Sequence, residues 1–140
     1  MKKNYTYRNH LVLRFILIAM ISFLFQGCQS LADVPTFSNN NTINVVVEIP
    51  AGTNTKVEYN KELKKLKVDQ QDGKDRIIEY LPYPGNYGFI PSTYSSSETG
   101  GDGDPLDALV ISSKLLSGSV VETTPIGVLK LMDNGEKDYK

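Results

Sequence analysis

Apolar positions along the chain follow two kinds of pattern. One apolar run, interrupted only by Ser22, covers residues 15–25. From residue 43 onward the apolar positions instead come in short groups, rich in Val, Ile and Leu, that are separated by Gly, Pro, Asn and Asp. Short groups of this kind predict strands joined by turns. We expect strands over residues 43–49, 56–59, 63–68, 76–80, 106–112 and 127–132, and no long helix.

The stretches between these groups predict turns and loops. Residues 51–54 and 71–74 contain the Gly, Asn and Asp residues typical of turns. Residues 82–91 are rich in residues that break regular structure, namely Pro82, Pro84, Gly85, Gly88 and Pro91. Residues 113–121 show only a weak pattern. Short strands with turns at intervals of roughly eight to twelve residues predict a mainly β fold, either a small barrel or a sandwich.

The apolar run near the start resembles a bacterial export signal. Basic residues precede it, and its length is too short for a helix to cross a hydrocarbon core about 30 Å thick. Residues 25–28 read Phe-Gln-Gly-Cys and resemble a lipobox, whose Cys becomes the lipidated first residue. We therefore predict a lipoprotein signal peptide over residues 1–27, lipidation at Cys28 and a location in the cell envelope, lipid-anchored or periplasmic. A plain export signal or an uncleaved anchor is the alternative.

Charge separates this signal from the rest of the chain. The whole sequence has 15 basic and 16 acidic residues, and residues 1–27 contain four of the basic ones. The remainder keeps 11 basic and 16 acidic residues, a net charge of −5. Such an acidic body argues against nucleic acid as a partner. Residues 28–43, which are polar and rich in Ser, Asn and Thr, predict a tether between the membrane and the domain.

The body of the chain also lacks two of the common catalytic side chains. The only His is His10 and the only Cys is Cys28, so both precede the predicted domain. A Ser-His-Asp triad, a Cys-His nucleophile, a zinc site built on His or Cys and a disulfide framework are therefore excluded there. Any chemistry must come from carboxylates, Lys, Arg, Tyr and hydroxyl groups.

Three carboxylates fall within six residues, at Asp102, Asp104 and Asp107. At a separation of about 4 Å and an effective dielectric constant of about 20, each pair of charges costs about 4 kcal/mol. A cation would relieve this repulsion, and oxygen ligands favour Mg²⁺ or Mn²⁺. The spacing does not match an EF-hand, and no Gly-Lys-Ser/Thr of a phosphate-binding loop occurs. A solvated acidic loop remains the alternative.

A second acidic group follows near residue 133, with Asp133, Glu136 and Asp138. Taken alone, the sequence Asp-Asn-Gly at 133–135 predicts a hairpin turn. Together with the first group it would complete a site for several metal ions. Sequence spacing does not decide between these two interpretations.

From residue 45 to 140 the chain resembles the family I soluble inorganic pyrophosphatases. The strongest match is Asp102-Gly-Asp-Pro-Leu-Asp107, which fits the signature of that family. Further matches occur in the same order as in the family, at residues 46–51, 56–58, 83–91, 125–130 and 133–140. The resemblance covers nearly all of the body.

The resemblance implies a role for each of twelve residues. Four would hold Mg²⁺ ions, with Mn²⁺ as an alternative: Asp102, Asp107, Asp133 and Asp138. Asp104 would be the general base, or would orient a metal-bound water. Glu48 and Glu58 would lie in the outer shell and reach the metals through water. Five would hold or surround the phosphates: Lys56, Arg76, Tyr83, Tyr87 and Lys140.

The resemblance also implies a fold and an activity. We expect residues 44–140 to form an OB-like small closed β-barrel that is incomplete at its C-terminal end, with the family's C-terminal helix missing from this chain. The full-length protein would be a homo-oligomer. The expected reaction is Mg²⁺-dependent hydrolysis of pyrophosphate to two phosphates, in which metal ions activate water and clamp the reacting oxygens.

Two alternatives from other functional classes stay open. The first is a non-catalytic, metal-binding lipoprotein of the envelope that retains the barrel. The second is an OB-type module that binds an oligosaccharide or a peptide through exposed aromatic side chains. The residues available for that second role are Tyr80, Tyr83, Tyr87 and Tyr94.

Overall fold

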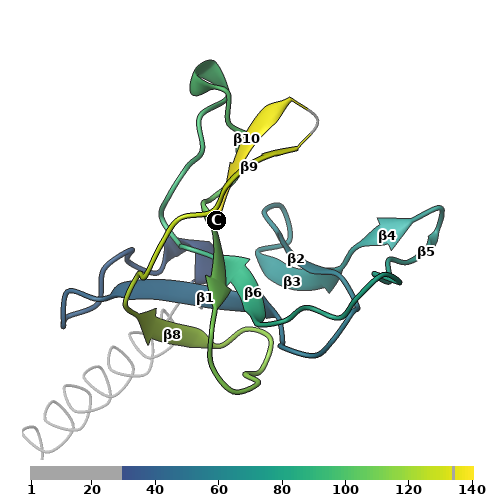
Figure 1. Ribbon diagram of the computed structural model, residues 1–140, viewed down its shortest axis with the longest axis horizontal. Helices are drawn as coiled ribbons and strands as arrows, with labels where there is room; N and C mark the ends of the chain where they lie inside the picture. Colours follow the sequence, from purple (N-terminus) through teal and green to yellow (C-terminus); the bar gives the residue numbers. More distant parts are fainter. Residues whose placement is uncertain (1–29, 134) are drawn as a thin grey trace, which may run out of the picture.

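The computed structural model describes residues 30–133 and 135–140. It is mainly β, as predicted, and its helical turns are two short 3₁₀ segments (Figure 1). The elements in chain order are η1 (Leu31–Asp33), β1 (Ile43–Ile49), β2 (Val57–Asn60), β3 (Lys65–Val68), β4 (Gln70–Gln71), β5 (Lys74–Asp75), β6 (Asn86–Phe89), η2 (Ser97–Thr99), β7 (Asp107–Val110), β8 (Val120–Thr123), β9 (Lys130–Asp133) and β10 (Glu136–Tyr139).

The predicted signal peptide and Cys28 lie outside the described residues. Within residues 30–133 and 135–140, no helix has the length and apolar character needed to cross a membrane.

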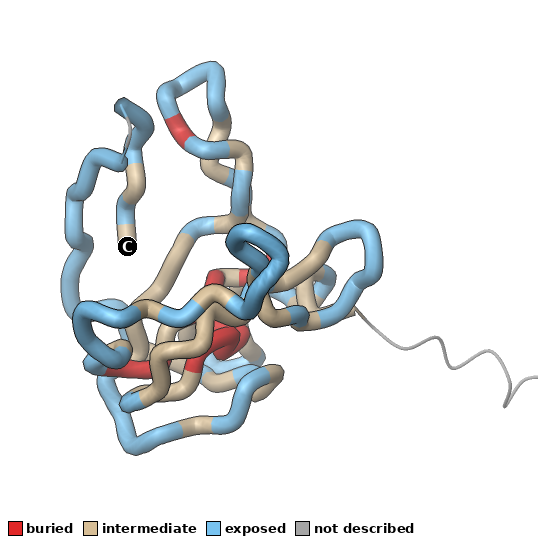
Figure 2. The backbone as a smooth tube through the Cα atoms, turned by 90° about the vertical axis from the view of Figure 1, so that its right-hand side faces the viewer, coloured by how far each residue is buried: buried red, intermediate tan, exposed pale blue. Residues whose placement is uncertain are grey.

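A four-stranded antiparallel sheet in the order β7-β6-β1-β8 forms the centre of the fold. Its strand β1 is buried along nearly its whole length, with Val45, Val46 and Val47 at most 2% exposed. Figure 2 shows that most of the buried segments gather in this sheet, while the surrounding hairpins and loops are mainly exposed or intermediate. Because β-branched residues pack well in a fully covered strand, the Val-rich run at 43–49 forms the core of the molecule.

The pairing of β1 with β6 depends on a glycine and a bulge. A Cβ atom at Gly88 would lie 1.9 Å from the carbonyl oxygen of Val46, so no larger residue fits this close approach. The register of the two strands shifts between Val47 and Ile49, which leaves Glu48 in a bulge. Bulges redirect side chains, and this one turns Glu48 toward the site described below.

Three hairpins, β2–β3, β4–β5 and β9–β10, surround the sheet. In Figure 1, β9 and β10 stand apart from the central sheet, next to the long connection between β6 and β7. The turn between β9 and β10 falls where the Asp-Asn-Gly sequence predicts it, because Asp133 and Glu136 are paired across the hairpin.

The described part of the predicted tether lies against the domain. The hydroxyl groups of Ser30 and Tyr59 share a hydrogen bond. Farther along, Thr36 Oγ1 donates to the carbonyl oxygen of Pro91 at 2.9 Å, and Ser92 Oγ donates to that of Val34 at 2.9 Å. The polar residues of this segment therefore satisfy main-chain and side-chain groups of the domain.

Two of the expected local structures are wrong, and one strand lies where none was predicted. Residues 76–80 do not form a strand, since Ile77 makes only an isolated bridge to Thr55. The stretch 82–91 contains β6, a central strand, because its prolines flank the strand and its Gly88 permits the close pairing. The weakly patterned stretch 113–121 runs into β8, which is held by pairing with β1 and not by an apolar pattern of its own.

Candidate active site

The first acidic group lies on the long connection between β6 and β7. We call residues 95–106 the acidic loop. Its base is closed by two hydrogen bonds, from Ser95 N–H to the carbonyl of Asp104 at 2.7 Å and from Gly103 N–H to the carbonyl of Ser95 at 2.8 Å. Gly101 is required inside it, because a Cβ atom there would lie 2.2 Å from Ser95 Oγ. The Asp104 main-chain N–H donates to the Asp102 carboxylate at 2.9 Å, and both aspartates are exposed.

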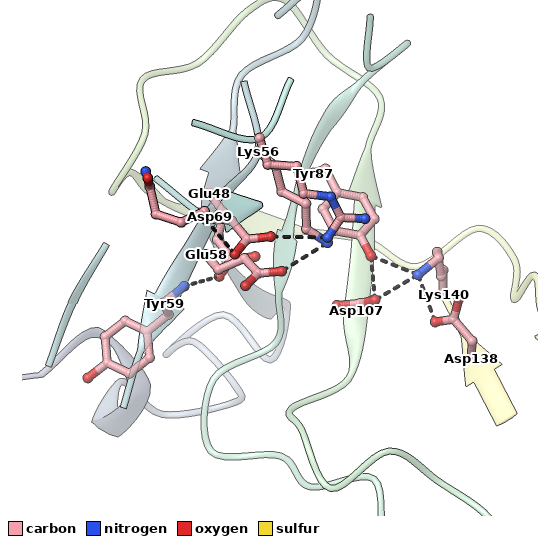
Figure 3. Close-up of polar contacts among 11 residues, drawn as sticks. Glu48, Lys56, Glu58, Tyr59, Asp69, Tyr87, Asp107, Asp138 and Lys140 are labelled. Carbon is pink, nitrogen blue, oxygen red and sulfur yellow. Dashed lines mark hydrogen bonds and ion pairs between the residues drawn. The ribbon is translucent and has the colours of Figure 1, made fainter. Parts of the chain in front are cut away.

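The second acidic group reaches the first through Lys140. The ammonium group of Lys140 donates hydrogen bonds of 2.7 Å each to Asp138 Oδ1, Asp107 Oδ2 and the hydroxyl of Tyr87 (Figure 3). Tyr87 in turn donates to the Asp107 carboxylate. The ammonium group also lies 5.0 Å from the centre of the Tyr87 ring. Three strands that are distant in sequence, β6, β7 and β10, thus place their side chains around one cation.

A cavity of about 300 Å³ contains side chains from both acidic groups. Ten of the twelve residues to which the resemblance assigns a role line it: Glu48, Lys56, Glu58, Tyr87, Asp102, Asp104, Asp107, Asp133, Asp138 and Lys140. Carboxylates that are separated by some thirty residues in the sequence therefore face the same space.

The ionisation of Lys140 and Tyr87 reflects their shared environment. Burial opposes the charge of Lys140, but its hydrogen bonds to Asp107, Asp138 and Tyr87 outweigh that effect and raise the pKa of its ammonium group. Burial, followed by the hydrogen bond to Asp107, raises the pKa of the Tyr87 hydroxyl as well. At neutral pH the cavity therefore holds a charged lysine and a protonated tyrosine beside the Asp107 carboxylate.

Glu48, Lys56 and Glu58 form another wall of the cavity. Glu48 Oε1 accepts a hydrogen bond from the Tyr59 N–H at 2.7 Å, which fixes the bulged side chain against β2. Burial raises the pKa of Glu48 to about 7, and the charge of Asp107 acts in the same direction. Lys56 Nζ lies 2.9 Å from Glu58 Oε1, so one cation is already paired at this wall.

Arg76 and Tyr83 lie next to the cavity without lining it. Arg76 Nη1 bonds Asp69 Oδ2 at 3.0 Å, and this contact lowers the pKa of Asp69. The Tyr83 ring packs on that of Tyr87, with ring centres 5.3 Å apart. Tyr83 therefore packs against a side chain of the site, whereas Arg76 is paired with Asp69, which does not line the cavity. The predicted contact of both residues with phosphate remains a prediction.

Three further charged residues line the cavity that sequence reasoning did not assign, namely Lys61, Glu136 and Lys137. Lys61 donates to the Asp104 carboxylate, and Lys137 donates to the carbonyl of Thr99 at 2.7 Å. Lys61 follows Glu58 by three residues, and the other two directly precede Asp138, so nearness to assigned residues was the only available signal.

The donor set fits a hard divalent cation. The carboxylates that line the cavity offer oxygen atoms alone, which is the chemistry that Mg²⁺ prefers. Within residues 30–133 and 135–140, no three His, Cys, Asp or Glu side chains come together as a preformed metal cage. Mg²⁺ does not require one, because it keeps several waters and binds through one or two carboxylates plus substrate phosphates.

Comparison with known proteins places this geometry in context. A family model for inorganic pyrophosphatase matches residues 45–140. The chain belongs to the inorganic pyrophosphatase family. It is 45% identical over 101 residues to the inorganic pyrophosphatase of Sulfolobus acidocaldarius, an alignment that covers 71% of this chain and 53% of that protein.

Solved pyrophosphatases share the fold. A type I inorganic pyrophosphatase from Toxoplasma gondii superimposes with a TM-score of 0.71 at 33% identity, over 76% of this chain and 53% of that one. A truncated vacuolar soluble pyrophosphatase from Trypanosoma cruzi, in complex with PPi, gives 0.68 at 29% identity, over 75% and 43%. This likeness confirms the mainly β, OB-like fold predicted from the sequence. The chain spans about half the length of the pyrophosphatases it matches.

Proposed function

We propose that this protein hydrolyses inorganic pyrophosphate to two phosphates with the help of Mg²⁺. The observation that carries the proposal is the meeting of two acidic groups, one on the acidic loop and one on β9–β10, around a cavity that also contains Lys56 and Lys140. Carboxylates that gather hard cations, together with cations that face a small space, suit a compact and highly charged anion such as pyrophosphate.

Four carboxylates would hold the metal ions: Asp102, Asp107, Asp133 and Asp138. When bound, Mg²⁺ lowers the pKa of water and neutralises charge on the phosphate oxygens. Manganese has similar ligand preferences and is the alternative ion. Lys140 already occupies Asp107 and Asp138, so this lysine keeps the two acidic groups together before any metal ion binds.

Asp104 is the proposed general base. Asp104 lines the cavity, its main-chain N–H donates to the Asp102 carboxylate, and its own carboxylate accepts a hydrogen bond from Lys61. It would accept the proton of the attacking water as the oxygen of that water bonds to phosphorus and the bridging P–O bond breaks. Lys56, Lys140 and Tyr87 would contact the equatorial and leaving oxygens, where negative charge develops. Arg76 and Tyr83 would support them from positions next to the cavity.

Glu48 and Glu58 would serve the metals from a distance, through water. Glu48 is fixed by its bond to the Tyr59 N–H, and Glu58 by its pair with Lys56. Held in this way, both carboxylates can orient water molecules without moving into the metals' inner shell.

The proposed setting is the cell envelope. Basic residues, an apolar run and a lipobox-like end precede the domain, and we propose that Cys28 carries a lipid anchor. The enzyme would then act on pyrophosphate at the outer side of the inner membrane or in the periplasm, and would assemble into homo-oligomers.

Release of phosphate from pyrophosphate tests the proposed function. We expect phosphate release at Mg²⁺ concentrations on the order of 1 mM, at which weak carboxylate sites fill. We expect no release after treatment with a chelator. Titration calorimetry of the same sample with Mg²⁺ separates two failures. Metal binding without phosphate release would favour the non-catalytic metal-binding lipoprotein, whereas neither binding nor release would remove the metal site itself.

A further inference from the structure

The acidic loop is held on one side by Lys137, a residue of β10. The Lys137 main-chain N–H donates to the carbonyl of Gly100 at 2.7 Å, and its ammonium group donates to the carbonyl of Thr99 at 2.7 Å. Its side-chain carbon Cε would lie only 3.7 Å from a Cβ atom at Gly100, so the stem of the lysine runs along the loop. One residue of the β9–β10 hairpin thus binds two successive carbonyl groups of the acidic loop.

Lys61 holds the same loop on its other side. This lysine comes from the turn between β2 and β3, and its ammonium group donates to the carbonyl of Gly103 at 3.3 Å and to the Asp104 carboxylate. Lys61 and Lys137 belong to different hairpins, and both line the cavity. The loop that carries Asp102 and Asp104 is therefore gripped between the β2–β3 hairpin and the β9–β10 hairpin.

Burial alone does little to position this loop. Residues 97–100 are exposed, as are Asp102 and Asp104, and Gly101 is its one buried residue between positions 97 and 104. Segments with few buried apolar contacts open at low free-energy cost. The polar contacts of the two lysines therefore decide where the loop lies relative to Asp133 and Asp138.

We propose that Lys137 and Lys61 are positioning residues that hold the acidic loop in register with the β9–β10 hairpin, so that carboxylates of both can share metal ions. The inference deepens the proposed function and rests on it, because it assigns a role in the same site. Lys137 has the larger part, since it joins one acidic group directly to the loop that carries the other.

The sign of the change in metal affinity distinguishes this role from a simple charge effect. Removal of a positive charge from an acidic cavity would by itself strengthen the binding of a cation. Loss of the contacts between Lys137 and the acidic loop would instead weaken Mg²⁺ binding, because the loop would then have to be ordered before its carboxylates act together. Lys137→Met thus gives opposite results under the two explanations.

The test compares Lys137→Met, Lys137→Arg and the control Lys130→Met in the full chain. Lys130 is an exposed lysine on the neighbouring strand β9, so its removal causes the same loss of charge outside the cavity. Amide hydrogen exchange of residues 99–103 and 137 is measured without metal, and Mg²⁺ affinity by titration calorimetry. Thermal unfolding of each variant verifies that it is folded.

We expect Lys137→Met to exchange these amides about tenfold faster and to bind Mg²⁺ about fivefold more weakly, as befits the loss of one charged hydrogen bond at an exposed site. Lys137→Arg should stay within about twofold of the unmodified chain, and so should Lys130→Met. The double variant Lys61→Met/Lys137→Met should open the loop further. Unchanged exchange, or tighter Mg²⁺ binding in Lys137→Met, would overturn the positioning role.

The exchange measurement also separates this inference from the proposed function. The unmodified chain could fail to hydrolyse pyrophosphate while Lys137→Met still shows faster amide exchange and weaker Mg²⁺ binding. The proposed activity would then be wrong, and the positioning role of the two lysines would stand. If hydrolysis is observed and the contrast is absent, the enzyme assignment stands and the role of the two lysines is wrong.

Discussion

Lys140 Nζ lies 2.7 Å from Asp107 Oδ2, although the two residues are 33 positions apart in the sequence. The same ammonium group lies 2.7 Å from Asp138 Oδ1. A single cation thus joins the last described residues of the chain to the strand that follows the acidic loop. Because like charges in a cavity repel, this lysine stabilises the metal-free protein as well as preparing the site for substrate.

Replacement of this lysine should therefore weaken the fold before metal is added. We expect Lys140→Met to lower the free energy of unfolding by about 1–2 kcal/mol in the presence of a chelator, because Asp107 and Asp138 lose their partner at a partly exposed site. Mg²⁺ should restore most of the loss, since a divalent ion can take over the neutralisation. Urea unfolding with and without Mg²⁺ measures both quantities. Lys114→Met, at an exposed lysine outside the cavity, is the control and should change neither value.

The general-base assignment predicts a separation between binding and turnover. Asp104→Asn keeps the size and the hydrogen-bonding capacity of the side chain but cannot accept the proton of water. We expect phosphate release to fall by about 100-fold or more, whereas Mg²⁺ affinity measured by calorimetry stays nearly the same. Asp72→Asn, in the exposed turn between β4 and β5, is the matched control. Turnover near the unmodified level in Asp104→Asn would remove the proposed role.

The pKa of Glu48 makes the stability of the metal-free protein depend on pH. Burial raises this pKa from 4.5 to about 7 in the folded state. Below pH 4.5 the side chain is protonated in both states and contributes no difference. As the pH rises from 4.5 to 7 the unfolded state releases its proton and the folded state keeps it, so the folded state loses stability.

The variant Glu48→Gln removes this dependence. Its amide oxygen can still accept the bond from the Tyr59 N–H. We expect it to be about 2–3 kcal/mol more stable than the unmodified chain at pH 8, and nearly equal to it at pH 4. Urea unfolding at the two pH values, in the presence of a chelator, measures the difference. A gain of the same size at both pH values would show that ionisation of Glu48 is not the cause.

Close packing of β1 on β6 gives a prediction about the fold. Gly88→Ala places a Cβ atom 1.9 Å from the Val46 carbonyl oxygen, so the two central strands must separate. We expect a loss of about 3 kcal/mol in the free energy of unfolding. Gly127→Ala is the natural control, because a Cβ atom there meets nothing within 4 Å and the backbone is not in the left-handed region. Equal stability of the two variants would contradict the reported register.

The same pair of strands shows where sequence reasoning succeeded and where it could not. The Val-rich run at 43–49 predicted a strand, and that strand is β1, which is buried in the centre of the sheet. The strand β6 was not predicted, because its residues, Asn-Tyr-Gly-Phe, combine a polar residue with a glycine between flanking prolines. Asn86 is fully buried there and bonds the N–H groups of Ala51 and Leu115, a role that tertiary structure alone reveals.

The candidate site divides in a similar way. The spacing of Asp102, Asp104 and Asp107 indicated a cation site, because three nearby carboxylates need compensation. Whether the group near Asp133 joined them depended on how β10 lies against the acidic loop, and that arrangement follows from long-range contacts. Lys137 was missed because an exposed lysine within a charged stretch has no distinctive pattern.

The lipobox-like sequence predicts that one residue, Cys28, determines whether the protein is held at the membrane. If Cys28 is lipidated, Cys28→Ala should move the protein from the membrane fraction to the soluble fraction, because an acylated cysteine supplies the apolar area that holds it there. Fractionation followed by immunodetection measures this, and metabolic labelling with a fatty-acid analogue reports the modification directly. Gln29→Ala changes the next residue and leaves the thiol in place, so it should remain membrane-bound and labelled. A Cys28→Ala variant that stays in the membrane fraction would instead favour an uncleaved apolar anchor formed by residues 15–25.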